Sequence, residues 1–111
     1  MSIDEAATRD ALDRIQADGS DLTRSLTMDF FVAVPNEQAG RAVAERARSS
    51  GFETDVSYDE PTQTWTTVCT VVMVPEQAAV VAAEIILDRL GQEFGGYADG
   101  FGTFGNAEPP S

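Results

Sequence analysis

The chain has 111 residues, a length that suits one domain with one hydrophobic core. Seven arginines stand against nineteen acidic residues, and without lysine or histidine the formal net charge is −12. This charge disfavours direct binding of nucleic acid and of anionic membranes, which require a basic surface, and it attracts a basic protein partner. Solubility, coding bias or a salt-rich cytoplasm also accounts for an acidic chain of this kind.

Several groups that often carry enzymatic chemistry are missing from the sequence. Without histidine there is no imidazole base and no histidine metal ligand. The single cysteine, Cys69, excludes a disulfide within the chain, and its β-branched neighbours predict a buried, unreactive thiol. We therefore expect no enzymatic activity, no cofactor and no metal. No apolar run in the sequence is long enough to span a membrane, and the N-terminus lacks a secretory signal, so a cytoplasmic protein is expected.

Two elements are predicted at the start of the chain. Apolar residues recur every fourth position over residues 4–18, which predicts a helix that Gly19 ends. Its apolar stripe consists of Ile3, Ala7, Ala11 and Ile15, with Leu12 beside it. Residues 27–34 show the alternation of a strand, and Pro35 is expected to end it.

The remaining pattern alternates between helical and strand periodicity. It predicts a helix over 37–50, strands over 52–58 and 64–74, a helix over 75–93, a strand over 97–104 and a frayed tail over 106–111. Asn36 is placed to cap the second helix, Gly51 to follow it, and Pro75 suits the first turn of the third helix. The apolar face of that third helix is expected to be Ala79, Ala83, Ile86, Leu87, Leu90 and Phe94.

This order predicts an α+β fold, a leading helix followed by the ferredoxin-like split βαβ sandwich β-α-β-β-α-β. Right-handed crossovers place two helices on one face of a four-stranded antiparallel sheet. Residues 1–111 are expected to form a single domain, with a leading helix and turn over 1–19, the core over 20–105 and the tail over 106–111. Both sides of the strand 64–74 are apolar or amphipathic, so one face needs cover from the first helix, a second subunit or another partner.

Three stretches of the sequence point to a family. Residues 17–22 end the leading helix, residues 47–56 make the step from helix to strand, and residues 97–104 read Tyr-Ala-Asp-Gly-Phe-Gly-Thr-Phe. In order and spacing over residues 5–105, they resemble the bacterial regulator of ribonuclease E activity type B, or ribonuclease E inhibitor (RraB), family. The resemblance implies a ferredoxin-like sandwich and a non-enzymatic protein that binds ribonuclease E outside its catalytic chemistry and restrains RNA decay.

The chain departs from the pattern of that family in three ways. An additional residue, Ala98, separates Tyr97 from Asp99, and Phe101 stands where a tryptophan is usual. The long acidic C-terminal tail of some relatives is absent from this sequence. These differences concern the partner more than the fold.

Other motifs have structural explanations. Residues 100–105 match G-x-G-x-x-G, but no helix follows to receive a pyrophosphate, so we interpret these glycines as a bend in a terminal strand. Residues 18–21 lack the ligand spacing of a calcium loop and are expected to form a turn. Asp55, Asp59 and Glu60 are interpreted as solvated groups of a hairpin rather than as an acid pair.

We predict that Tyr97, Asp99, Phe101 and Trp65 contact a protein partner, since aromatic residues are common at interface centres and a carboxylate pairs with arginine. Packing in the core or at a sheet edge is the alternative for the aromatic residues, including Phe104. The expected partner is ribonuclease E or another basic protein segment. A ferredoxin-like sensor domain for a small ligand, forming a homodimer through its open sheet face, is the alternative function. A deep apolar pocket with convergent polar groups would favour the sensor, whereas a flat acidic face with exposed aromatic residues would favour the protein-binding regulator.

Overall fold

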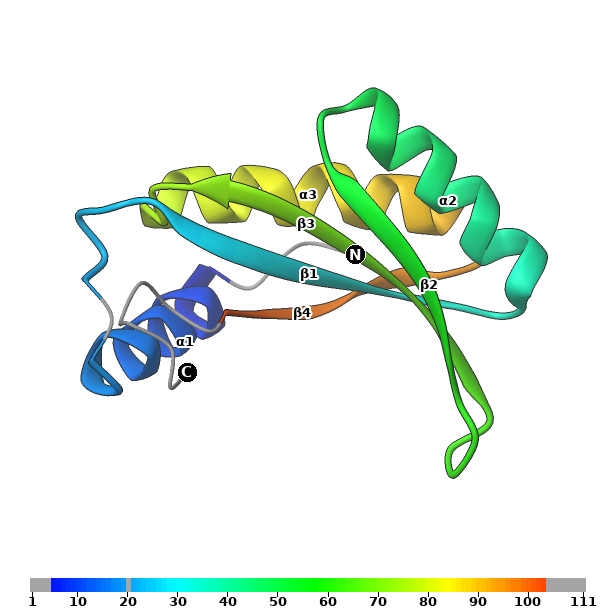
Figure 1. Cartoon of the computed structure of the whole chain (residues 1–111), viewed down its shortest axis with the longest axis horizontal. Helices are drawn as coiled ribbons and strands as arrows, with labels where there is room; N and C mark the ends of the chain where they lie inside the picture. Colours follow the sequence, from blue (N-terminus) through cyan, green and yellow to red (C-terminus); the bar gives the residue numbers. More distant parts are fainter. Residues whose placement is uncertain (1–4, 20, 104–111) are drawn as a thin grey trace, which may run out of the picture.

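The computed structural model describes residues 5–19 and 21–103. In chain order its elements are α1 (Glu5–Ala17), β1 (Leu26–Val34), α2 (Glu37–Ser49), β2 (Glu53–Asp59), β3 (Thr64–Met73), α3 (Gln77–Glu93) and β4 (Tyr97–Thr103) (Figure 1). Every expected helix and strand is present, with ends within two residues of the prediction wherever they fall in the described ranges. The third helix begins at Gln77 rather than at Pro75, and Phe104, expected in the last strand, lies outside the described residues.

The four strands form one antiparallel sheet in the order β2-β3-β1-β4. This is the ferredoxin-like split βαβ arrangement, with β1 and β3 in the centre and β2 and β4 at the edges. It confirms the predicted α+β fold. The β2–β3 hairpin extends beyond the body of the molecule (Figure 1).

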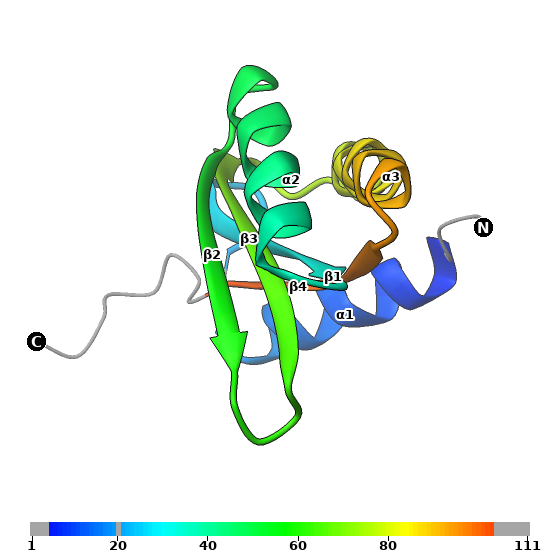
Figure 2. The same cartoon turned by 90° about the vertical axis from the view of Figure 1, so that its right-hand side faces the viewer.

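Helices α2 and α3 cover one face of the sheet, and the core lies between them and the strands (Figure 2). The alternate residues of β1 that point to these helices are fully or almost fully buried: Leu26, Met28, Phe30, Val32 and Val34. Asn36 caps α2 by accepting a hydrogen bond from the backbone N–H of Ala39 at 2.8 Å, as the sequence predicts. The hydroxyl of Thr67 on β3 links the sheet to α2 by donating a hydrogen bond to the backbone carbonyl of Gly40 at 2.9 Å.

The leading helix α1 packs against α3 beside β4, not over the uncovered face of the sheet (Figure 2). Of the predicted stripe, Leu12 is fully buried, Ile15 packs against the core and Ala11 is half-buried, but Ala7 is exposed and Thr8 is buried in its place; Ile3 lies outside the described residues. The reason is a polar contact that hydrophobic periodicity does not detect: the Thr8 hydroxyl donates to a carboxylate oxygen of Glu84 on α3 at 2.7 Å.

The prediction of the apolar face of α3 was also partly wrong. Ile86, predicted to face inward, is 46 % exposed, and Val80, absent from the predicted face, is fully buried. Two acids, Glu84 and Asp88, are buried on this helix because α1 and β4 supply hydrogen-bond donors to them. An inward-facing acid cannot be recognised from periodicity when its donor lies on a distant element.

Strand β4 contains a bulge. Between the pairs Val32–Ala98 and Phe30–Phe101, β1 advances by two residues and β4 by three. The bulge places one extra residue in β4 opposite β1, and Gly100 in the bulge has a φ of 105° that favours glycine. The bulge leaves Asp99 and Gly100 opposite Phe31.

Candidate functional site

The face of the sheet turned away from the helices is the candidate site, and we call it the open face. Figure 1 views the molecule from this side, and Figure 2 shows the helices on the opposite side. The strand register arranges its residues in rows that cross the sheet. One row contains Asp55, Val68, Phe31 and the Asp99–Gly100 bulge; the next contains Glu53, Thr70, Asp29 and Gly102; a third contains Ser57, Thr66, Ala33 and Tyr97.

Apolar side chains cross the open face in a line that we call the apolar diagonal: Val72, Val68, Phe31 and Tyr97. Val72 is 66 % and Tyr97 46 % exposed, and the two central residues are half-buried. The ring of Phe31 lies over Gly102, because a Cβ atom built there would be 3.8 Å from its Cε2. The diagonal therefore presents aromatic and aliphatic surface to a partner.

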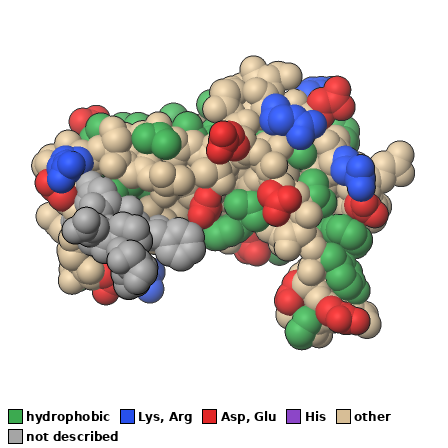
Figure 3. All heavy atoms as spheres, in the orientation of Figure 1, with side chains coloured by type: hydrophobic (Ala, Val, Ile, Leu, Met, Phe, Trp, Pro, Cys, Tyr) green, Lys and Arg blue, Asp and Glu red, His purple; other side chains and the backbone are tan. Residues whose placement is uncertain are grey.

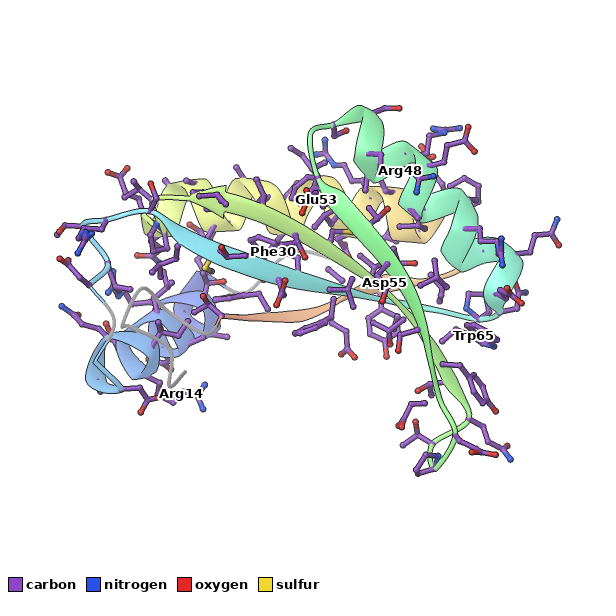
Figure 4. The ribbon with its side chains drawn as sticks, viewed as in Figure 1. Arg14, Phe30, Arg48, Glu53, Asp55 and Trp65 are labelled. Atoms are coloured by element: carbon purple, nitrogen blue, oxygen red, sulfur yellow. The ribbon has the colours of Figure 1, made fainter. Side chains whose placement is uncertain are left out.

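Carboxylates border the apolar diagonal on both sides. Glu53 and Asp55 project from β2 on one side (Figure 4), and Asp29 and Asp99 lie on the other. Asp29 is held in place by the Thr70 hydroxyl, which donates to it at 2.6 Å. No described arginine forms an ion pair with any of these four acids. We refer to them as the four face carboxylates.

Positive charge is absent from the strands, since all seven arginines of the sequence lie on helices or in loops. Three of them are paired with acids on helices: Arg9 with Asp13, Arg41 with Glu37 and Arg46 with Glu93. In the space-filling view, acidic side chains gather over the middle of the sheet and arginines stand at the periphery (Figure 3). The open face is therefore a negatively charged surface with an apolar centre.

The four residues predicted to contact a partner do not form one patch. Tyr97 and Asp99 lie on the open face, and both are exposed. Phe101 is on the helix side, where its ring centroid is 5.8 Å from that of Phe30 in the core. Trp65 is also on the helix side, on the β2–β3 hairpin, with its ring centroid 4.8 Å from that of Tyr58 (Figure 4).

Sequence reasoning did not select Phe31, Val68, Val72, Asp29 and Glu53 as contact residues, although each follows from strand alternation once the covered face is known. The detectable signal was the charge of the strands. The four strands contain five acids and no arginine, which is visible from the sequence and the predicted strand positions.

The remaining candidates are structural. Cys69 is fully buried, and desolvation raises the pKa of its thiol to about 11, so it is protonated at neutral pH and a poor nucleophile. Asp21 accepts hydrogen bonds from the backbone and hydroxyl of Thr23, and these bonds lower the pKa of its carboxyl. Within the described ranges, no three or more acids or cysteines are grouped so as to hold a metal ion. None of the helices there is long and apolar enough to cross a membrane.

Two surface grooves lie away from the open face's centre. One of about 410 Å³, between α2 and β2, is lined by Arg41, Ala44, Glu45, Arg48, Thr54, Asp55 and Val56. Another of about 290 Å³ is lined by residues at the start of α2 and by Phe94. The larger groove is lined mainly by charged side chains, unlike the mostly apolar pockets that bind small ligands.

Comparison with known proteins relates nearly the whole chain to one family. The model of the family described as "Regulator of ribonuclease activity B" matches residues 5–103, from the start of α1 to the end of β4. A search of curated proteins found no match to this chain.

Proposed function

The chain belongs to the regulator of ribonuclease activity B family, and from this membership and its acidic open face we propose that it regulates a ribonuclease by binding it. The leading partner is ribonuclease E, and the expected consequence of binding is slower RNA decay. The observation that carries the proposal is the open face, where apolar residues are bordered by four carboxylates that form no ion pair with any described arginine. Such a face attracts a basic segment of a partner and adds specificity through its apolar centre.

The proposed regulation involves no catalytic step by this chain. The sequence contains no histidine, and its single thiol is buried with a raised pKa. A regulator of this kind lowers the activity of the nuclease without cleaving RNA itself. RNA cleavage by the purified chain, abolished by one carboxylate substitution, would contradict this part of the proposal.

Tyr97 and Asp99 are the proposed contact residues on the open face, and Trp65 is the proposed contact on the hairpin. Phe101 packs against the core, so we expect Phe101→Ala to lower the stability of the domain before it affects binding. Asp99→Ala is expected to keep the fold and weaken binding, because the side chain is exposed.

The test is calorimetric titration of ribonuclease E with the purified chain, together with an assay of RNA cleavage. We expect binding, inhibition of cleavage, and weaker binding as salt rises to about 0.5 M, where the Debye length falls to a few ångströms. Circular dichroism of each variant separates loss of binding from loss of fold. No binding at low salt, or affinity that is unaffected by both salt and Asp99→Ala, contradicts the proposal.

The alternative, a small-ligand sensor that dimerises through the open face, is disfavoured by charge. A twofold contact places the same patch of both subunits together, so the four face carboxylates of one copy would meet those of the other. Like charges brought together in an interface cost several kcal/mol. Sedimentation that shows a dimer, lost in Val68→Arg, would support the alternative.

A further inference from the structure

The apolar diagonal and the four face carboxylates together describe the shape of the segment that binds. Glu53 and Asp55 stand on the β2 side of the diagonal, and Asp29 and Asp99 on the β4 side. Asp55 and Asp99 are at opposite ends of one row, and three strand spacings of about 4.8 Å put their backbones roughly 14 Å apart. A bound segment has to direct apolar side chains toward the sheet and carry cations on both of its flanks.

An α-helix meets these requirements. With its side chains it is about 10–12 Å wide, so flanking cations reach both groups of carboxylates while its underside rests on Phe31 and Val68. An extended strand points its side chains alternately toward and away from the sheet and offers no such pair of flanks. The opposite face of this sheet is itself covered by helices.

The length of the apolar diagonal sets the length of the helix. From Val72 to the row of Tyr97, the diagonal crosses three row intervals along the strands and two strand spacings. This distance is roughly 22 Å, which corresponds to about 15 residues of helix, or four turns. A single helix of ordinary length therefore spans the open face.

We propose that the open face binds an amphipathic, basic α-helix of about 15 residues from the partner. Apolar side chains at i, i+3 or i+4, and i+7 contact the apolar diagonal, and arginine or lysine on both flanks pairs with the four face carboxylates. This inference deepens the proposed function and rests on it, since it specifies which part of a ribonuclease partner binds.

The first experiment compares two synthetic 18-residue peptides of identical composition, leucine, alanine and arginine. One places leucine along one helical face with arginine on both flanks, and its permuted isomer distributes the same residues evenly around the helix. We expect the amphipathic peptide to gain helicity on mixing with the full chain and to bind at least roughly tenfold tighter in calorimetry. Equal affinity of the two peptides, or binding without a gain in helicity, would overturn the inference.

The second experiment locates the amphipathic peptide with matched charge reversals. Asp55→Arg and Asp99→Arg reverse a face carboxylate on either side of the diagonal, and Glu60→Arg makes the same change at the tip of the β2–β3 hairpin. We expect roughly tenfold weaker binding for each of the first two and less than roughly twofold for the third. Where circular dichroism shows a reversal to be unfolded, the asparagine variant at the same position replaces it, with roughly threefold weakening expected.

An equal effect of all three reversals would mean that net charge alone controls affinity, and it would overturn the inference. Failure of the inference differs from failure of the proposed function. A chain that binds ribonuclease E but neither peptide refutes the helix and leaves the regulator intact. A chain that binds the amphipathic peptide on the open face but no ribonuclease refutes the regulator alone.

Discussion

Asp88 fixes the position of β4, which carries Tyr97 and Asp99. Its side chain is only 5 % exposed on α3, and one carboxylate oxygen accepts the backbone N–H of Ala98 at 2.9 Å. Since β4 is an edge strand, this N–H points away from β1 and has no strand partner. The other oxygen accepts a hydrogen bond from the Gln92 amide at 2.6 Å. We therefore predict that Asp88→Ala destabilises the domain and loosens β4.

The magnitude follows from the hydrogen bonds lost. A hydrogen bond to a charged group contributes about 1.5–3 kcal/mol, and a part-buried N–H left without a partner is costly in its own right. We expect the free energy of unfolding to fall by about 2–3 kcal/mol, a large share of the roughly 5–15 kcal/mol typical of a domain. The corresponding fall in melting temperature is roughly 10 °C. Urea unfolding and amide hydrogen exchange at Ala98 measure the global and the local effect.

Asp88→Asn is the matched control, because it keeps an oxygen that accepts the Ala98 N–H while it removes the charge. Its new NH2 group meets Gln92, whose exposed side-chain amide can turn to accept a hydrogen bond from it. Its free energy of unfolding should lie within about 1 kcal/mol of that of the wild type, since a neutral hydrogen bond is weaker than a charged one but is still formed. If Asp88→Ala costs less than about 0.5 kcal/mol, or if Asp88→Asn is equally damaging, the reasoning about the acceptor is wrong.

Three further variants test the packing around α3. Burial raises the pKa of the Glu84 carboxyl in the folded state, so the stability of the protein falls as pH rises from the ordinary value of 4.5 through the folded pKa. Glu84→Gln should therefore have a higher melting temperature than the wild type at pH 7, and this difference should disappear below pH 4.5. The control Glu60→Gln should show no such difference. Gly91→Ala should cost about 1–3 kcal/mol in urea unfolding despite better helix propensity, because the new Cβ would lie 2.9 Å from Val32 Cγ1 in the core. Leu12→Ala should cost about 2–5 kcal/mol, since this side chain anchors α1 to the core; an unchanged melting temperature would show that α1 is dispensable.

Local chemistry made most of the fold predictable. Asn36 and Gly51 mark the ends of α2 because a side-chain oxygen must accept the free N–H groups at one end and a φ of 98° is needed at the other. The alternation of inward and outward residues predicted for β1 agrees with the observed burial at every position, because a single face of this strand meets the helices. These features depend on neighbours a few residues away, which the sequence displays directly.

The errors arose where distant elements meet. Thr8 and Glu84 are buried as a hydrogen-bonded pair 76 residues apart, and no periodicity of either helix predicts this. Phe101 and Trp65 were grouped with Tyr97 because they are aromatic. Their separation onto two faces depends on the bulge in β4 and on the β2–β3 register. Tertiary pairing, not residue type, decides which side chains share a surface.

The distribution of charge bears on whether the acidity of this chain serves only solubility. Acidic residues increase solubility wherever they lie on the surface, and they still do so when cations lie between them. Here Arg41 and Arg46 pair with acids of the helices, while the four face carboxylates around the apolar diagonal form no ion pair with any described arginine. Exposed apolar residues and unpaired charges of one sign on the same face are features of a surface that binds. Since the helices of the described ranges 5–19 and 21–103 cover one side of the sheet, those ranges leave the other side for a partner.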